Sequence, residues 1–308
     1  MFALRGLVVG LSFFGVCYCV LSLVVVMLWH AARFLRCHTL FKSARALFAL
    51  RIFPLAASAF VTLVFAVPAF LRLEGGMDED LGTFIFSLGT LLLFAAGCVR
   101  IVAAQSGASR LLSEWLAESK LLNASPIAST LSARHCPPPL LLYGIRAPQV
   151  LVSESAVALL GPEELRVAIR HEVSHMRSRD NLKKLVLHGI PFPGMGNLER
   201  AWQEGAEFAA DEAAVSTSDE ALNLAAALIK MCSLAPAQEP PAFTTGLVGL
   251  TALVDRRVHR LVAWNGESAR AGKIRWAWFL LLPAVGYGIF TYNHALFLTH
   301  RFTEWFIH

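Results

Sequence analysis

Charged residues are scarce in this sequence of 308 residues: they make up 16% of the chain, against about 25% in an ordinary soluble protein. Hydrophobic residues make up 56%. The shortage of charge is greatest in the first hundred residues and near the C-terminus, whereas residues 110–275 are rich in charge. The composition therefore argues against an ordinary soluble protein and predicts a membrane-anchored protein with one polar domain.

A C-x-x-C spacing is missing among the six cysteines, so the sequence indicates neither a thiolate zinc site nor a thioredoxin-like redox pair. The net charge of +5 does not indicate nucleic-acid binding. Many of the basic residues stand beside apolar runs, where they set the orientation of membrane spans. We therefore expect no nucleic acid among the partners.

Four apolar runs come close to or exceed the roughly 20 residues that a helix needs to cross a bilayer. They are residues 6–29, 52–71, 81–99 and 276–298. The first run carries no charge and is longer than the roughly 7–15 residues of a signal peptide's apolar region. We therefore expect four transmembrane helices in a lipid bilayer, the first of them an uncleaved span.

The charges between the runs predict the topology. Residues 30–51 contain basic side chains and no acid, whereas the connector at residues 74–80 is acidic. Because basic loops stay in the cytoplasm, the N-terminus is expected outside and the polar domain inside. This divides the chain into a three-span region (1–104), a cytoplasmic domain (105–275), and a fourth span with a short tail (276–308).

An H-E-x-x-H motif stands in a predicted helix over residues 162–178, whose start is marked by Pro at the first helical position and by acids in the first turn. Its two imidazoles, on His171 and His175, are four residues apart and share one face of the helix. They can therefore bind one metal ion, and Glu172 between them is placed to act on the water that a catalytic metal activates.

A third protein ligand is expected, because zinc in a hydrolase usually takes three and keeps one position for water. A second predicted helix, residues 198–216, carries Glu207 and Asp211 four residues apart. One of these carboxylates can reach the metal while the other supports an imidazole through its second nitrogen. Glu204 shares this face and is the alternative ligand; a solvated acidic face is the other interpretation.

Two short β-type runs, residues 140–143 and 149–152, predict an antiparallel pair or two edge strands. We hypothesise that the second run pairs with an extended substrate backbone. The apolar Pro/Gly-rich stretch at residues 189–196 is either a contact with membrane or substrate, or an ordinary tight connector.

The sequence H-E-V-S-H-M-R-S-R-D over residues 171–180, followed by E-F-A-A-D-E over residues 207–212, resembles the BlaR/MecR-type integral-membrane zinc metallopeptidases. HtpX-like peptidases have a similar motif pair and come second. The specific resemblance covers about residues 140–215, and the order of spans extends it more weakly to the whole chain. It implies zinc ligands at His171, His175 and Glu207, a catalytic base at Glu172, and a supporting acid at Asp211.

The resemblance also implies a fold: a mainly α membrane protein of four transmembrane helices, with a cytoplasmic gluzincin-like α+β zinc peptidase domain between the third and fourth spans. It implies a bacterial inner membrane, a role in signal transduction, and a substrate that is a cytoplasmic repressor or a membrane protein. Two departures stand out. The penicillin-binding sensor domain is missing, so we expect no β-lactam sensing of that kind and reliance on a separate sensor protein. Ala210 stands where the BlaR/MecR type commonly has Cys, as in HtpX-like proteins.

The first hypothesis is thus a membrane-embedded zinc endopeptidase. The alternative is a non-hydrolytic signalling or scaffold protein with a zinc-binding cytoplasmic domain. Glu172 favours the enzyme, because a structural zinc site needs no base and is usually closed by four ligands. A transporter is disfavoured, because it would place ionisable residues within its spans, where the sequence has only His294.

Overall fold

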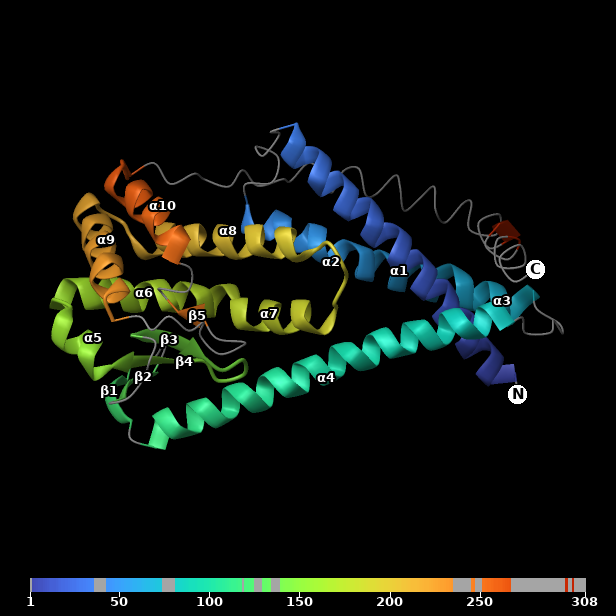
Figure 1. Ribbon diagram of the computed structural model, residues 1–308, viewed down its shortest axis with the longest axis horizontal. Coiled ribbons are helices and arrows are strands. Elements are labelled where there is room, and N and C mark those ends of the chain that lie inside the picture. The colour runs from blue at the N-terminus through green and yellow to red at the C-terminus, as the bar shows by residue number, and fades with distance from the viewer. Residues whose placement is uncertain are drawn as a thin grey trace. The chain divides into compact units, whose positions relative to one another are not determined.

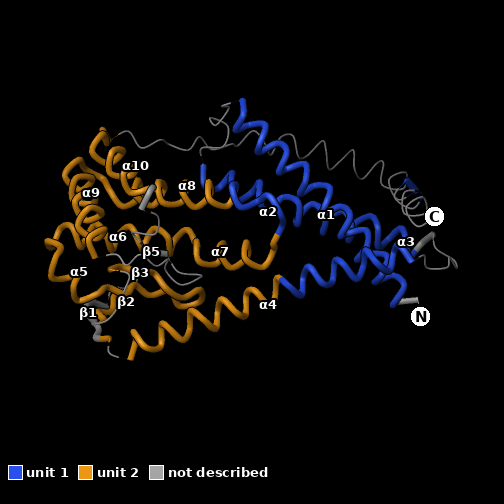
Figure 2. Tube along the Cα trace, viewed as in Figure 1, with its two compact units in different colours: residues 1–96, 192–198, 270–308 blue, residues 97–191, 199–269 orange. Residues whose placement is uncertain are grey.

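A computed structural model of the chain is mainly helical, with one small sheet (Figure 1). It describes residues 2–35, 43–73, 81–117, 119–124, 129–133, 139–234, 245–246, 251–266, 297–298 and 301. The chain divides into two compact units (Figure 2). The first comprises Met1–Ala96, Phe192–Leu198 and Arg270–His308; the second comprises Gly97–Pro191 and Glu199–Ala269.

Three helical segments of the described chain are long and apolar enough to cross a membrane: Leu4–Phe34, Ala44–Leu71 and Leu81–Ala117. Their elements are α1 (Phe2–Phe34), α2 (Ala44–Val61), the π-helical turn η2 (Thr62–Ala66), α3 (Val67–Leu73) and α4 (Leu81–Ala117). They agree with the first three predicted spans. The fourth predicted span lies outside the described residues except for its last two positions.

The surface of these helices suits a lipid environment. Only 17–33% of their most apolar windows is buried within the protein, so large side chains such as Leu7, Met27 and Leu92 remain exposed. Such continuous apolar exposure is not stable in water. The apolar helices therefore favour a bilayer as surroundings.

Two features of the first unit refine the sequence interpretation. A Cβ atom on Gly15 of α1 would lie 1.9 Å from Oγ1 of Thr90 on α4, so only glycine allows this close helix approach. Arg51 lies inside the second candidate span and is 1% exposed. The helical segment thus begins before the second predicted span and includes this arginine.

The Pro/Gly-rich stretch before α8 (Gly196–Ala214) lies against α1. The Phe192 ring meets the Tyr18 ring edge-on, with centroids 5.7 Å apart. Gly194 has a φ of +85°, and a Cβ there would lie 3.2 Å from Val26. The stretch is therefore packed against a candidate membrane helix of the same unit, and whether it contacts membrane or substrate stays a prediction.

The second unit contains a five-stranded sheet of order β1-β2-β4-β3-β5. The strands are β1 (Lys120–Ala124), β2 (Ser129–Ala133), β3 (Leu140–Tyr143), β4 (Gln149–Ser153) and β5 (Thr245–Gly246). The antiparallel pairing predicted for the third and fourth strands is confirmed. However, β4 is hydrogen-bonded to β2 on its other side. The hypothesis that this strand pairs with substrate is therefore wrong, because both of its edges are occupied within the sheet.

Alternation along β3 divides the buried residues of this unit between the two faces of the sheet. Leu140 and Leu142 pack into a cluster with helices α5, α6, α9 and α10. Leu141 packs on the other face with Trp115 of α4. These helices are α5 (Glu154–Leu159), α6 (Pro162–Ser178), α9 (Ser218–Cys232) and α10 (Thr251–Val262). The sheet is thus covered by α4 on one face and by α6 on the other (Figure 1).

Helix α6 begins and ends where the sequence predicts. Pro162 occupies the first turn, and Oε2 of Glu164 accepts a hydrogen bond of 2.8 Å from the N–H of Gly161. The helix stops at Arg179, whose φ of 55° is left-handed. This tight turn leads directly into α7 (Asp180–Gly189), so α7 starts close to the C-terminal half of α6.

Candidate metal centre

The H-E-x-x-H residues occupy the inward face of α6. This helix packs on β3 and α9 through Val167 and Ala168, which are 0% exposed. Because of the helical period, residues that follow Val167 or Ala168 by four or seven positions lie close to the same face of the helix. His171 and Glu172 are accordingly 0% exposed and His175 is 1% exposed.

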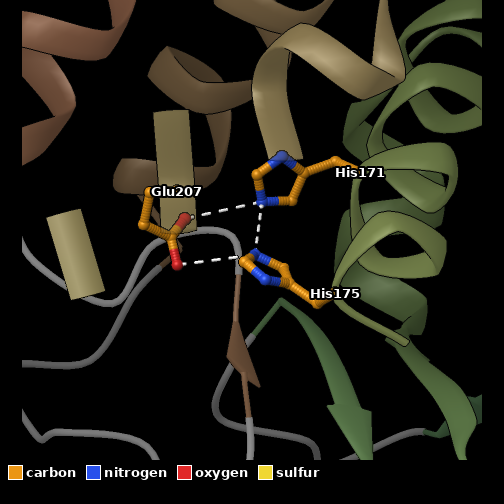
Figure 3. Close-up of side chains that lie close together, drawn as sticks. All are labelled: His171, His175 and Glu207. Atoms are coloured by element: carbon orange, nitrogen blue, oxygen red, sulfur yellow. Dashed lines mark hydrogen bonds and ion pairs between the residues drawn. The ribbon is translucent and has the colours of Figure 1, made fainter. Parts of the chain in front are cut away.

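Glu207 of α8 faces both imidazoles (Figure 3). The two Nε2 atoms of His171 and His175 lie 3.2 Å apart. Glu207 places Oε2 3.5 Å from His171 Nε2 and Oε1 3.5 Å from His175 Nε2. Atoms that bind one ion tetrahedrally at about 2.0–2.1 Å lie about 3.3 Å from one another. The three side chains therefore fit a single divalent metal ion.

Glu204, the alternative third ligand, lies elsewhere. Its Oε2 is 3.0 Å from Nη1 of Arg256, and its side chain is 31% exposed. The group that could hold a metal comprises His171, His175 and Glu207 and does not include it. The close packing of α8 thus separates two glutamates that the sequence pattern left as alternatives.

A carboxylate lies beside the second ring nitrogen of each imidazole. Asp211 Oδ1 lies 3.0 Å from Nδ1 of His171, which is the supporting position predicted for this acid. Asp180 Oδ2 lies 2.8 Å from Nδ1 of His175, a contact that the sequence analysis did not assign. The feature of the sequence that could have indicated this contact is the short separation: Asp180 follows His175 by five residues, just past the end of α6. Such carboxylates fix ring orientation and leave Nε2 for the metal.

Arg257 of α10 is a second residue that the sequence analysis did not assign to the site. It is 2% exposed. Its Nη1 lies 2.9 Å from Glu207 Oε2, and its Nη2 lies 2.5 Å from Asp211 Oδ1. Nothing in the local sequence distinguishes this arginine from its neighbours, so only packing reveals it.

The charges shift the pKa values of the carboxylates downward. Burial alone would raise the pKa of Glu207, but Arg257 and His175 outweigh it and hold this pKa well below its usual range. Burial likewise opposes ionisation of Asp211 and Asp180. Arg257 lowers the pKa of Asp211, and the His175 ring lowers the pKa of Asp180.

Glu172 and His175 shift the other way. Complete burial raises the pKa of Glu172, although the two imidazoles act against it. Burial opposes a proton on His175, but Glu207 and Asp180 outweigh it and raise its pKa to about 10. The carboxylates around His175 thus favour a positive charge in the site, and a proton on the His175 ring supplies it when no metal is bound. Metal binding must displace that proton, because a ligating imidazole is neutral.

No protein-family model and no curated protein matches this chain. The features of the site that indicate a function are a buried His-His-Glu group with metal-ligand spacing, a carboxylate behind each imidazole, and a buried glutamate beside them.

Proposed function

We propose that the protein is an integral-membrane zinc-dependent endopeptidase, a hydrolase that cuts a regulatory or membrane protein. The single observation that carries the proposal is the triangle of ligand atoms, 3.2–3.5 Å on each side, with Glu172 directly beside it in the helix. The resemblance to BlaR/MecR-type peptidases, with HtpX-like peptidases second, supports the same conclusion from the motif.

Zinc is the proposed metal because the donor set is two imidazoles and one carboxylate. This set is typical of catalytic zinc, which keeps its fourth position for water or substrate. Hard cations such as Mg²⁺ and Ca²⁺ prefer oxygen donors alone. The proposed location is a bacterial inner membrane with the centre in the cytoplasm, since the basic segment at residues 30–51 favours that orientation.

The chain's residues divide the chemistry among them. A zinc ion held there would polarise the scissile carbonyl and make water more acidic. Glu172 takes up the proton of the attacking water at its carboxylate and passes it to the leaving amine nitrogen. Asp211 and Asp180 keep both rings oriented throughout. The excluded solvent around Glu172 strengthens each of these electrostatic contacts.

The burial of the site bears on how a substrate reaches it. Glu172 is 0% exposed, whereas Glu207 keeps 16% side-chain exposure. A polypeptide reaches Glu172 only after neighbouring groups move. We therefore propose a closed resting form that opens on the side of Glu207, in response to a substrate or a separate sensor protein. The same burial favours the alternative function, a zinc-binding signalling or scaffold protein without turnover.

The test is metal content together with proteolysis of an unfolded protein, measured on the full chain in detergent. Glu172→Gln should keep one zinc per chain and lose cleavage by about 10²-fold or more, because only the base is removed. Glu163→Gln is the matched control: it lies on the same helix, pairs with Arg166, and is 61% exposed. It should leave zinc and cleavage unchanged.

The outcomes separate the two functions. If the wild-type chain binds zinc and cleaves the substrate, and only Glu172→Gln loses cleavage, the result supports the peptidase. Zinc bound without cleavage, even when the native membrane is supplied, favours the signalling protein. Absence of zinc from the wild-type chain, after incubation with the metal, overturns the metal centre itself.

A further inference from the structure

Arg257 enters the metal centre from a helix that contains no part of the motif. Its guanidinium forms a two-pronged contact with Asp211: Nε donates to Oδ2 at 2.8 Å and Nη2 donates to Oδ1 at 2.5 Å. Its Nη1 faces Glu207 Oε2 at 2.9 Å. One side chain therefore joins the proposed third ligand to the acid that supports His171.

The neighbouring arginines of α10 lie on the outside of the same helix pair. Arg256 pairs with Glu204 at 3.0 Å, and its side chain is 60% exposed. Arg260 lies 3.7 Å from Glu212 and is 51% exposed. Both guanidinium groups also stand over the Phe208 ring of α8, at 5.5 and 5.0 Å from its centre. Exposed pairs of this kind contribute little individually, and neither arginine is paired with a ligand of the proposed metal.

The geometry of the buried arginine has a direct consequence for the ligand. Nη1 of Arg257 forms an ion pair of 2.9 Å with Oε2 of Glu207, while the other carboxylate oxygen, Oε1, lies 3.5 Å from Nε2 of His175. The Nη2 atom itself lies 3.4 Å from Nε2 of His171. A guanidinium is planar and holds two carboxylates in fixed directions, which a lysine ammonium cannot do.

We propose that Arg257 is a positioning residue of the metal centre, and that the ligand set is complete only when α10 is docked on α8. The inference rests on the proposed metal centre. It assigns no contact with substrate to Arg257, because the side chain is 2% exposed and three of its nitrogens face the two carboxylates. A buried ion pair with no influence on the metal is the competing explanation.

The experiment compares Arg257→Lys with Arg256→Lys and Arg260→Lys in the full chain in detergent. Zinc affinity is measured by competition with a chromophoric chelator, and coordination by the absorption spectrum of the Co²⁺ form. Lysine keeps the positive charge that Asp211 requires, so the variant is expected to fold. Arg257→Gln is the second variant, and thermal unfolding of each metal-free protein checks the fold.

We expect Arg257→Lys to bind zinc about 10–100-fold more weakly, as is usual when a group behind a ligand is changed, with an altered Co²⁺ spectrum. The two control variants should match the wild type. Wild-type affinity and spectrum in Arg257→Lys overturn the proposal, as does an equal loss in all three variants, because the effect would then not be specific to the buried arginine.

The same measurements test the role of Arg257 independently of the proposed peptidase activity. A protein that binds zinc but cleaves nothing refutes the peptidase, yet the affinity comparison still decides the role of Arg257. If cleavage occurs, Arg257→Lys should lower kcat with little change in KM. A change in KM alone would indicate substrate contact and contradict a positioning role.

Discussion

Asp180 offers the sharpest test of how the centre is organised, because its carboxylate has two separate tasks. Oδ2 holds Nδ1 of His175 at 2.8 Å, and Oδ1 accepts from Nζ of Lys183 at 2.7 Å. The Asp180 carboxylate and the His175 ring are 3% and 1% exposed. Asp180→Asn keeps the shape and removes the charge. Its amide nitrogen would then face either the ring N–H or the lysine ammonium, and both are donors.

We expect Lys183 to turn into water, since its side chain is already 22% exposed. The amide oxygen then keeps His175 in place, but the ring loses the negative charge that makes Nε2 a strong ligand. Loss of such a partner typically weakens metal binding by about 10–100-fold, which corresponds to about 1.4–2.8 kcal/mol. Zinc competition with a chromophoric chelator at constant pH measures this loss directly.

Two matched variants isolate the cause. Lys183→Gln removes the ion pair but keeps the carboxylate, so its zinc affinity should stay within a few-fold of the wild type. Asp255→Asn changes a carboxylate that is 82% exposed and should have no effect. If Asp180→Asn binds zinc within twofold of the wild type, the carboxylate behind His175 does not tune the ligand, and the reasoning is refuted.

Two further predictions concern stability, measured by thermal unfolding of the full chain in detergent. Gly97→Ala should lower the stability of the protein by about 1–3 kcal/mol, because its Cβ would lie 2.1 Å from the carbonyl oxygen of Gly189. Gly107→Ala is the control: a Cβ there meets nothing within 4 Å, so this variant should raise the stability by up to about 1 kcal/mol. Equal effects of the two substitutions would contradict the close approach at Gly97. Burial raises the pKa of Glu164, but Lys230 and the N–H of Gly161 outweigh it and lower this pKa. The contribution of the Glu164 charge should be fully present above the unfolded-state pKa of about 4.3 and should be lost as pH falls through the lower folded-state pKa. Glu164→Gln should therefore cost more stability at pH 7 than at acid pH. A cost independent of pH would exclude the charge as its cause.

The parts of the fold that the sequence predicts well are those with local causes. The candidate spans follow from continuous hydrophobicity, which needs no tertiary partner to be recognised. The start of α6 follows from Pro162 and the acids in its first turn. The approach of His171 and His175 follows from the helical period alone, since any helix puts residues four apart on one face.

Other features depended on packing between segments far apart in the chain. The position of β4 within the sheet was one of them, because local alternation identifies β4 as a strand but does not distinguish an inner strand from an edge strand. Arg51 was another: its charge suggested a cytoplasmic loop, whereas the helix that contains it extends through this position and buries its side chain.

By itself, the sequence determined apolar segments long enough to cross a membrane, and a helix that carries two imidazoles on one face with a glutamate next to them. Only the tertiary structure decided which residues complete that face. It selected Glu207 over Glu204, placed Asp180 behind His175, and brought in Arg257, which is 86 residues from His171. The reason is physical: helical periodicity acts over a few residues, whereas a metal ion needs atoms within a few ångströms of one another, and distant segments meet at that distance only through the packing of α6, α8 and α10.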